Sequence, residues 1–139
     1  MSNDISLNSK LFAKQIMKII ISIKPEYAFR IFDGSKRFEF RKTMFANEIK
    51  TALIYATMPL GKVMGEFEVK NIIVENPANL WEMTKKYAGV DRKSFDEYFY
   101  NRKSAVAIEI GSVCEYKLPL ELHEIQHGLR APQSFSYLK

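Results

Sequence analysis

The strongest constraint on the fold of this 139-residue chain is a series of strand-type segments separated only by short helical ones. Segments that are rich in β-branched residues or alternate between apolar and polar side chains predict strands. They span residues 18–23, 36–42, 51–57, 63–74 and 104–116, and the tail from residue 131 could add a last strand. Short helices are expected over residues 25–34 and 91–100, after Asn76-Pro77, and within residues 119–128.

Strands and helices do not alternate regularly along the chain, so a parallel sheet built from βαβ units is not expected. The pattern predicts an α+β fold, in which a small mixed β-barrel of five to six strands has short helices around it. Gly65 and Gly111 fall inside strand segments, where glycine typically marks a bulge or a close approach of two backbones.

Length and composition indicate one globular domain. Apolar residues make up 47% of the chain, and at this size folding requires neither a disulfide nor a metal ion. Residues 18–139 are expected to form the domain, while residues 1–17 form an N-terminal extension that is partly disordered or folded into a short helix. The oligomeric state stays open.

The single cysteine, Cys114, cannot form an internal disulfide, which favours a reducing, cytoplasmic location. No apolar run reaches the roughly 18–20 residues that cross a bilayer, so no membrane association is expected. The N-terminus also lacks the apolar core and cleavage site of a signal peptide.

The positive charge is concentrated in the first third of the chain. Residues 1–50 hold ten Lys and Arg against five Asp and Glu, whereas residues 51–139 hold eleven of each. The whole net charge of +5 therefore lies before residue 51. Such an excess favours an anionic partner such as a nucleic acid, although a charge of this size also serves solubility alone.

Residues 123–127 read H-E-x-x-H, the pattern by which two histidines on one helix face bind zinc. The pattern lacks a third ligand, because the twelve residues after His127 contain no His, Cys, Asp or Glu. Gly128 also follows the second histidine directly, where a helix typically ends. No metal site is therefore expected, and the segment is interpreted as a polar surface helix.

The most informative segment is Gly34–Arg41, which has the form G-x-K-x-x-E-x-R. Its apolar residues, Phe38 and Phe40, alternate with charged ones and would fix the strand in the core. Arg37, Glu39 and Arg41 would then share the opposite face.

Lys36 is out of phase with Glu39 and can join it only because it sits at the Gly34 turn, before strand geometry begins. Such a cluster can bind an anion or the polar edge of a nucleobase, with Arg41 as donor and Glu39 as acceptor. A lysine beside a carboxylate in a partly dry pocket can also act as a base. The alternative is a solvated strand face with surface ion pairs.

These residues resemble the ASCH domain, a branch of the PUA-like superfamily. The likeness extends over residues 18–138 through the segments IIISIKPEYAFRIFDGSKRFEFRK, LIYATMPLGKVMGEFEV, SAVAIEIGSV and APQSFSYL. It implies a PUA-like barrel with a cleft beside the motif strand. The family is associated with RNA, so the resemblance implies an RNA, nucleotide or nucleoside ligand and no cofactor.

Two functions follow from the resemblance. In the first, the chain is a binding module that holds a single-stranded or extruded, in some cases modified, nucleotide. The ligand-binding residues are then Lys36, Arg37, Glu39, Arg41, Tyr55 and Thr57, and the tail residues Gln133, Ser134 and Phe135 are candidates to close the cleft.

In the second, the chain is a hydrolase acting on RNA or on an acylated or modified nucleoside. Some ASCH proteins resemble amidohydrolases that use a Lys, a Thr and a Glu to remove an acyl group from cytidine. Lys36 matches that Lys, Glu39 stands at the position of the Thr, and Glu97 is the candidate for the Glu. The missing hydroxyl weakens deacylation, and Lys36 and Glu39 are the expected active-site residues. A third hypothesis, a sensor or part of a transcriptional regulator, is not supported by a helix-turn-helix.

Overall fold

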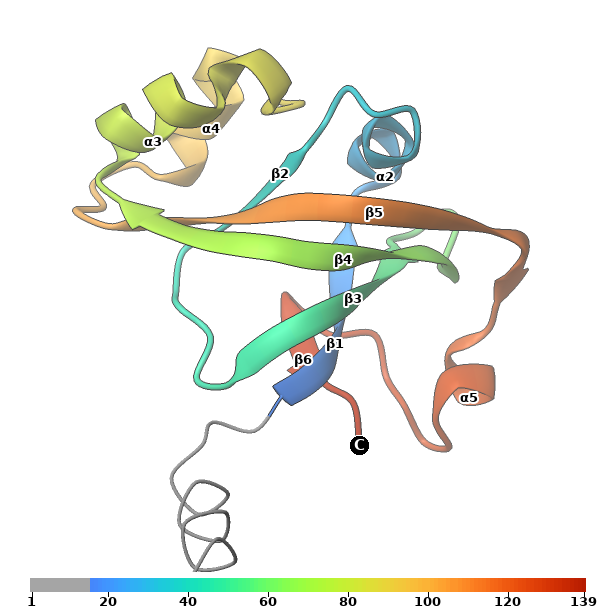
Figure 1. The fold of residues 1–139 in the computed structure, drawn as a ribbon. Helices are drawn as coiled ribbons and strands as arrows, with labels where there is room; N and C mark the ends of the chain where they lie inside the picture. Colours follow the sequence, from blue (N-terminus) through green and yellow to red (C-terminus); the bar gives the residue numbers. More distant parts are fainter. Residues whose placement is uncertain (1–15) are drawn as a thin grey trace, which may run out of the picture.

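A computed structural model describes residues 16–139 (Figure 1). The elements in chain order are β1 (Ile16–Ile23), α2 (Pro25–Phe32), β2 (Phe38–Arg41), β3 (Glu48–Ala56), β4 (Lys62–Glu75), α3 (Pro77–Thr84), a 3₁₀ turn (Lys85–Tyr87), α4 (Arg92–Tyr98), β5 (Ala105–Leu120), α5 (Leu122–Ile125) and β6 (Phe135–Tyr137). Of the predicted N-terminal extension, residues 1–15 lie outside the described residues, whereas Ile16 and Met17 begin β1.

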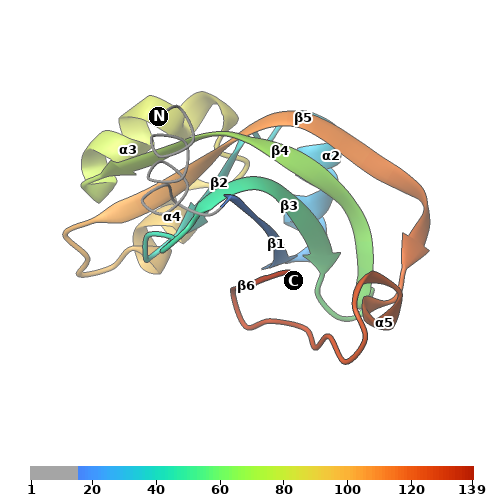
Figure 2. The same ribbon diagram turned by 60° about the horizontal axis from the view of Figure 1, so that its bottom comes forward.

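Six strands form one curled sheet in the order β2-β5-β4-β3-β1-β6 (Figure 2). β1 and β3 run parallel, and all other neighbouring pairs are antiparallel. The curl makes a half-barrel with β2 and β6 as its edges, and the helices are short and peripheral. The predicted α+β fold with a small mixed barrel is therefore confirmed.

Helix ends follow the local sequence signals. Pro25 begins α2, and Gly34, two residues after the helix, adopts a φ of +86°, which glycine takes at no steric cost. The Asn76 side chain caps α3 by accepting from the Asn79 N–H at 2.9 Å, and Asp91 caps α4 by accepting from the Ser94 N–H at 2.7 Å. These three helices begin at the predicted residues to within one position.

Two strands differ in length from the prediction, because their ends depend on which backbone groups they pair with. β2 is only four residues long, because the N–H groups of Lys36 and Arg37 donate to Arg30 and Tyr87 carbonyls instead of a neighbouring strand. β5 runs to Leu120 because that residue still pairs with Val63 of β4.

The glycines at the irregularities of β4 and β5 lie where the backbones come close. A side chain at Gly65 would overlap the carbonyl oxygen of Cys114 and the ring of Phe32. The pairing of β4 with β5 shifts register in the stretch that contains Gly111. The predicted close approach at Gly65 and bulge at Gly111 are confirmed.

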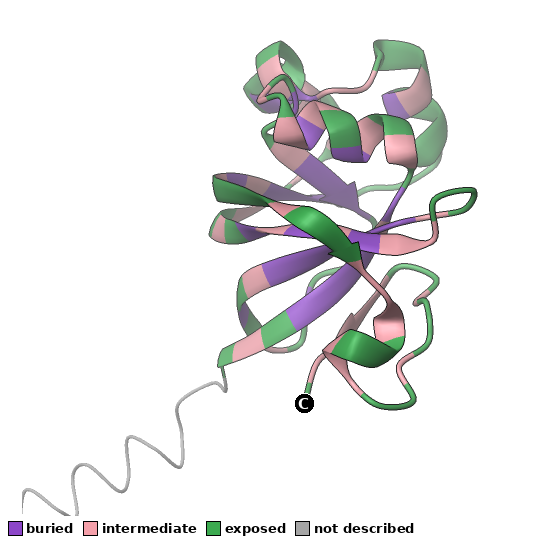
Figure 3. Ribbon diagram, turned by 90° about the vertical axis from the view of Figure 1, so that its right-hand side faces the viewer, coloured by how far each residue is buried: buried purple, intermediate pink, exposed green. Residues whose placement is uncertain are grey.

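Two apolar clusters position the site, and Figure 3 shows where buried residues lie along the ribbon. The first fills the curl between α2 and strands β1, β3 and β5, with Ile21, Ile31 and Ile54 among its members. The second packs α3 and α4 against β2 and β5 around Phe40, Phe95 and Phe99. α2 belongs to one cluster and α4 to the other, and the charged side chains of the motif strand lie between these two helices.

Candidate functional site

A cavity of about 680 Å³ lies between α2, β2, α4 and the segment that precedes β6. Ser22, near the end of β1, and Thr57, in the turn directly after the parallel strand β3, also line the cavity. The remaining polar lining is Lys24, Tyr27, Lys36, Glu39, Arg41, Ser94, Glu97, Tyr98, Gln133 and Ser134. The motif strand β2 therefore faces a cavity of the size that small ligands occupy.

Lys36 lies at the base of this cavity and is 1% exposed. Its Nζ donates to the Ala88 carbonyl oxygen at 2.7 Å and lies 3.5 Å from Glu39 Oε1. The same nitrogen is 4.9 Å from the centroid of the Phe40 ring and 5.4 Å from that of Tyr27. A carbonyl, a carboxylate and two aromatic faces thus replace the water that an exposed ammonium would bind.

Glu39 lies between the two motif cations and is 5% exposed. Its Oε1 faces Lys36, while its Oε2 accepts a hydrogen bond from Arg41 Nη1 at 2.5 Å. The predicted neighbourhood of Lys36, Glu39 and Arg41 is present, but the solvated strand face is not, since all three residues are buried. We call these residues the charged trio, which carries one net positive charge when Lys36 is protonated.

Arg41 connects strands that are not neighbours in the sheet. Its Nη1 also donates to the Phe40 carbonyl at 2.6 Å, and its Nη2 donates to the Ser22 carbonyl of β1 at 2.9 Å. The Nε is buried without a hydrogen-bond partner among residues 16–139. The guanidinium therefore spans the open side of the half-barrel and keeps one unused donor.

Burial and charge shift two titrating groups at the cavity. Burial lowers the pKa of the Lys36 ammonium, and the neighbouring Glu39 carboxylate opposes that shift. Burial likewise raises the pKa of the Tyr98 hydroxyl, while the nearby Arg41 guanidinium acts in the opposite direction. Because the pKa of Lys36 is lowered, a larger fraction of its side chain is neutral than would be the case for a lysine in water.

The remaining predicted site residues separate into two groups. Thr57, Glu97, Gln133 and Ser134 line the cavity together with the charged trio. Tyr55 does not, because its side chain is buried in a separate cluster with Ile20, Leu53 and Val63. Phe135 also lies outside the cavity lining, with its ring against Phe45.

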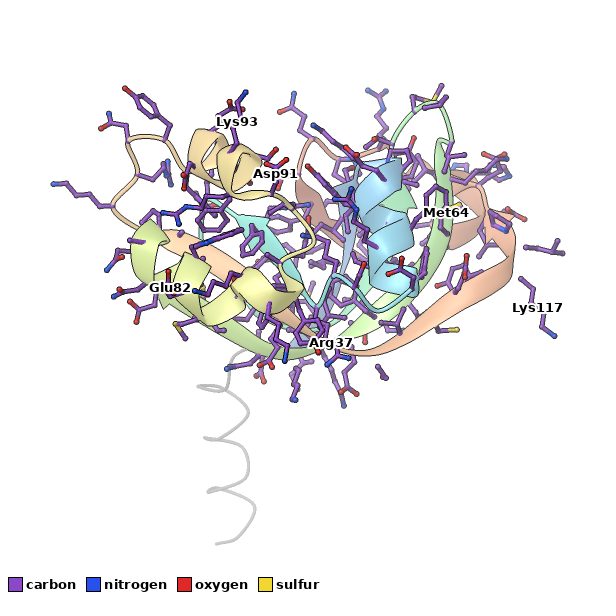
Figure 4. All side chains as sticks on the ribbon, turned by 90° about the horizontal axis from the view of Figure 1, so that it is seen from above. Arg37, Met64, Glu82, Asp91, Lys93 and Lys117 are labelled. Carbon is purple, nitrogen blue, oxygen red and sulfur yellow. The ribbon has the colours of Figure 1, made fainter. Side chains whose placement is uncertain are left out.

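Arg37 points to another part of the surface. Its guanidinium stacks on Tyr87, 4.2 Å from the ring centroid, and lines a separate cavity of about 460 Å³ on the other side of Lys36. Figure 4 shows Arg37 on the side of the molecule opposite Asp91 and Lys93 of the α4 region. Arg37 therefore does not line the cavity that contains the charged trio.

Sequence patterns did not single out several residues that form the site. Tyr27 and Tyr98 line the cavity from α2 and α4, and the Ala88 carbonyl holds Lys36. The one sequence feature that could have indicated the role of the Ala88 carbonyl is the glycine that follows it, Gly89. It adopts a φ of +68°, and a side chain there would overlap the Lys36 side chain.

The H-E-x-x-H segment does not form one helix face. α5 ends at Ile125, and Gln126 is extended with a φ of −159°, so His123 and His127 are not one helical turn apart. Within the described part of the chain, no three His, Cys, Asp or Glu side chains are grouped to hold a metal ion. None of the helices described over residues 16–139 is long and apolar enough to cross a membrane.

A curled mixed sheet with a cavity beside a short edge strand matches the fold of small domains of the PUA-like class. A family model described as the ASCH domain matches residues 21–114, which is more than half of the sequence. The chain belongs to the ASCH domain family.

Several proteins are similar to this chain over most of its length. The crystal structure of ASCH from Zymomonas mobilis superimposes with a TM-score of 0.81 at 27% identity, covering 88% of both chains. The ASCH domain-containing ribonuclease of Zymomonas mobilis is 27% identical over 86% of this chain and 83% of its own length. The large ribosomal subunit protein uL22 of Ureaplasma parvum is 30% identical over 87% of this chain, which spans only 39% of that protein.

Proposed function

We propose that this chain binds RNA by holding a single-stranded or extruded nucleotide in the cavity beside β2. The observation that carries the proposal is the charged trio, because buried charges at the base of an open cavity are costly unless the site uses them. Its net positive charge favours a phosphate, and its carboxylate can accept from a base edge.

The shape and lining of the cavity support a nucleotide-sized ligand. The volume of about 680 Å³ falls within the range of ligand sites, and Tyr27 and Tyr98 supply aromatic surface. Bases of single-stranded RNA are recognised by stacking on such rings and by hydrogen bonds to their edges.

The relatives support RNA as the ligand class. The Zymomonas mobilis protein that matches nearly the whole chain is named a ribonuclease, so its substrate is RNA. The Ureaplasma parvum protein carries the name of a ribosomal subunit protein, although this chain corresponds to a minor part of it.

The binding proposal is tested with a labelled single-stranded RNA in a fluorescence anisotropy titration. Arg41→Lys keeps the charge but loses the fork of donors, and Arg41→Gln loses both. A hydrogen bond to a charged group is worth about 1.5–3 kcal/mol, so Arg41→Gln should weaken binding by roughly 10- to 150-fold.

Lys117→Gln is the matched control, because Lys117 is an exposed cation at the far end of β5 (Figure 4). Circular dichroism establishes that each variant is folded. Equal affinity of the wild type and both Arg41 variants would contradict binding in this cavity.

A second candidate is hydrolysis of RNA or of an acylated or modified nucleoside in the same cavity. It is favoured by the lowered pKa of Lys36, since a neutral amine can accept a proton from an attacking hydroxyl or water. Lys36 is held by Ala88 and Glu39, so its amine must turn into the cavity to act directly. Glu97 at the rim of the cavity is the alternative base.

Turnover is measured with a fluorophore–quencher RNA and a panel of acylated nucleosides. Lys36→Met and Glu97→Gln should each abolish or strongly reduce turnover by folded protein, and Lys117→Gln should not. RNA binding without product from any of these substrates would reject hydrolysis and leave the binding function.

A further inference from the structure

A group of exposed side chains outside the cavity continues from the motif strand across the loop between α4 and β5. We call it the rim surface and define it by Lys42, Tyr98, Tyr100, Arg102 and Lys103. Lys42 directly follows Arg41, and its Nζ lies 4.8 Å from the centroid of the Tyr98 ring. Because Tyr98 also lines the cavity, the rim surface and the cavity are continuous.

A tight turn holds this surface in place. The Arg102 N–H donates to the Phe99 carbonyl at 3.0 Å, and Asn101 adopts a φ of +59°, which asparagine tolerates better than most residues. The Arg102 guanidinium donates to the Lys42 carbonyl at 2.7 Å and so joins the turn to the end of β2. The turn leaves the Tyr100 ring 83% exposed.

The charge of the rim surface is wholly positive. Residues 42–47 and 98–104 contain no Asp or Glu, and Lys42, Arg102 and Lys103 take part in no ion pair among the described residues. The neighbouring Asp96 is paired with Arg92, and Glu97 lies at the cavity. Three cations are thus available to an anionic partner beside an exposed aromatic ring.

We propose that the rim surface binds the nucleotides of a single-stranded RNA that flank the one held in the cavity. Lys42, Arg102 and Lys103 contact successive phosphates, and a base stacks on the Tyr100 ring. Cations that follow the backbone together with aromatic side chains that stack bases are the features by which proteins bind single strands. This inference rests on the proposed function, and it adds that the ligand is a strand longer than one nucleotide.

The stacking part is tested by comparing two probes: an RNA of about ten nucleotides, within the usual site size of single-strand binders, and the four ribonucleoside monophosphates. Stacking of one base is worth about 1–3 kcal/mol, so Tyr100→Ala should weaken RNA binding by roughly 5- to 150-fold. Its affinity for the monophosphates should stay unchanged. Tyr100→Phe keeps the ring and should bind RNA like the wild type.

The phosphate part is tested by the salt dependence of RNA binding. Each neutralised phosphate on a single strand adds about 0.7 to the slope of log affinity against log salt concentration. The double variant Arg102→Gln/Lys103→Gln should therefore lower the magnitude of the slope by about 1.4. Lys117→Gln, far along β5, should leave it unchanged (Figure 4).

The outcomes separate this inference from the proposed function. Wild-type protein that binds neither the RNA nor a monophosphate overturns the proposed function and this inference with it. RNA binding that Arg41→Gln weakens but the rim variants leave intact overturns the rim surface alone. An equal loss of RNA and monophosphate affinity in Tyr100→Ala would also refute it, because the ring would then act within the cavity.

Discussion

Replacing Glu39 by Gln removes the only carboxylate of the charged trio and leaves two buried cations side by side. Lys36 is 1% exposed and Arg41 9% exposed, so neither can recover the lost interaction from water without moving. Removing one partner of a buried pair costs about 3–5 kcal/mol, and we expect Glu39→Gln to lower the free energy of unfolding by that amount. For a domain of this size the melting temperature should fall by roughly 10 °C or more.

Lys36→Met is the informative comparison, because it removes a buried charge instead of stranding one. Glu39 keeps its hydrogen bond from Arg41, and the Ala88 carbonyl loses its donor. An unsatisfied buried acceptor costs about 1–3 kcal/mol, offset in part because the ammonium is no longer desolvated. Lys36→Met should therefore be less destabilising than Glu39→Gln, and the double variant should be more stable than Glu39→Gln alone.

The pH dependence of stability separates this explanation from simple loss of packing. Burial lowers the pKa of Lys36 in the folded state, so the unfolded chain binds more protons at pH values between the folded pKa and the ordinary lysine value of 10.5. The stability of the folded protein should therefore rise with pH between the lowered pKa of Lys36 and its ordinary value. Without the opposing Glu39 carboxylate, the pKa of Lys36 falls further, and the rise should begin at lower pH in Glu39→Gln.

The measurement is urea denaturation of wild type, Glu39→Gln, Lys36→Met and the double variant over a range of pH values. Variants with Met at position 36 lack the contribution of this one lysine. The difference in the free energy of unfolding between proteins with and without Lys36 therefore isolates its titration, and this difference changes by at most about 1.4 kcal/mol per pH unit. A loss below about 1 kcal/mol in Glu39→Gln, with an unchanged pH profile, would refute the argument that the trio is a buried, mutually dependent charge cluster.

Three further substitutions test the scaffold around the site by chemical denaturation. Gly89→Ala puts a methyl group against Lys36 at a φ of +68°, and we expect a loss of about 2 kcal/mol or more together with weaker RNA binding; unchanged stability would show that the loop moves freely. Leu80→Ala removes a fully buried side chain from the α3–α4 cluster and should lower the free energy of unfolding by about 2–5 kcal/mol. A smaller loss would mean that the two helices move together and fill the space that the leucine side chain leaves. Asn76→Ala removes the cap of α3 and should cost about 1 kcal/mol, with Asn76→Asp retaining the stability.

The sequence predicted the parts of the site that depend on short-range geometry. Alternation placed Glu39 and Arg41 on one face, and the Gly34 turn explained how Lys36 joins them. Arg37 shares the same alternation but leaves the face: its carbonyl still accepts from the Ile110 N–H of β5, whereas its N–H donates to the Tyr87 carbonyl, so regular strand pairing stops at this residue. Alternation is a property of a paired strand, and β2 begins only at Phe38.

The same limit explains the separation of Tyr55 from Thr57. Side chains two residues apart in a regular strand lie on the same face. However, the strand ends at Ala56, and its register with β4 shifts at Tyr55. Tyr55 therefore stays in the core while Thr57, already in the turn, reaches the cavity. Tyr27 and Tyr98 could not be found in this way, since only the packing of α2 and α4 on either side of β2 brings them together.

The charged trio also explains how so short a strand can support the proposed binding site. Its two cations donate to carbonyl oxygens of Ala88, Phe40 and Ser22, which belong to three separate segments of the chain. These bonds fix the cations before any ligand arrives, so binding does not have to order them and their charge acts at full strength in a partly dry cavity. The residues that hold the open side of the half-barrel together are therefore the same ones that a nucleotide would meet there.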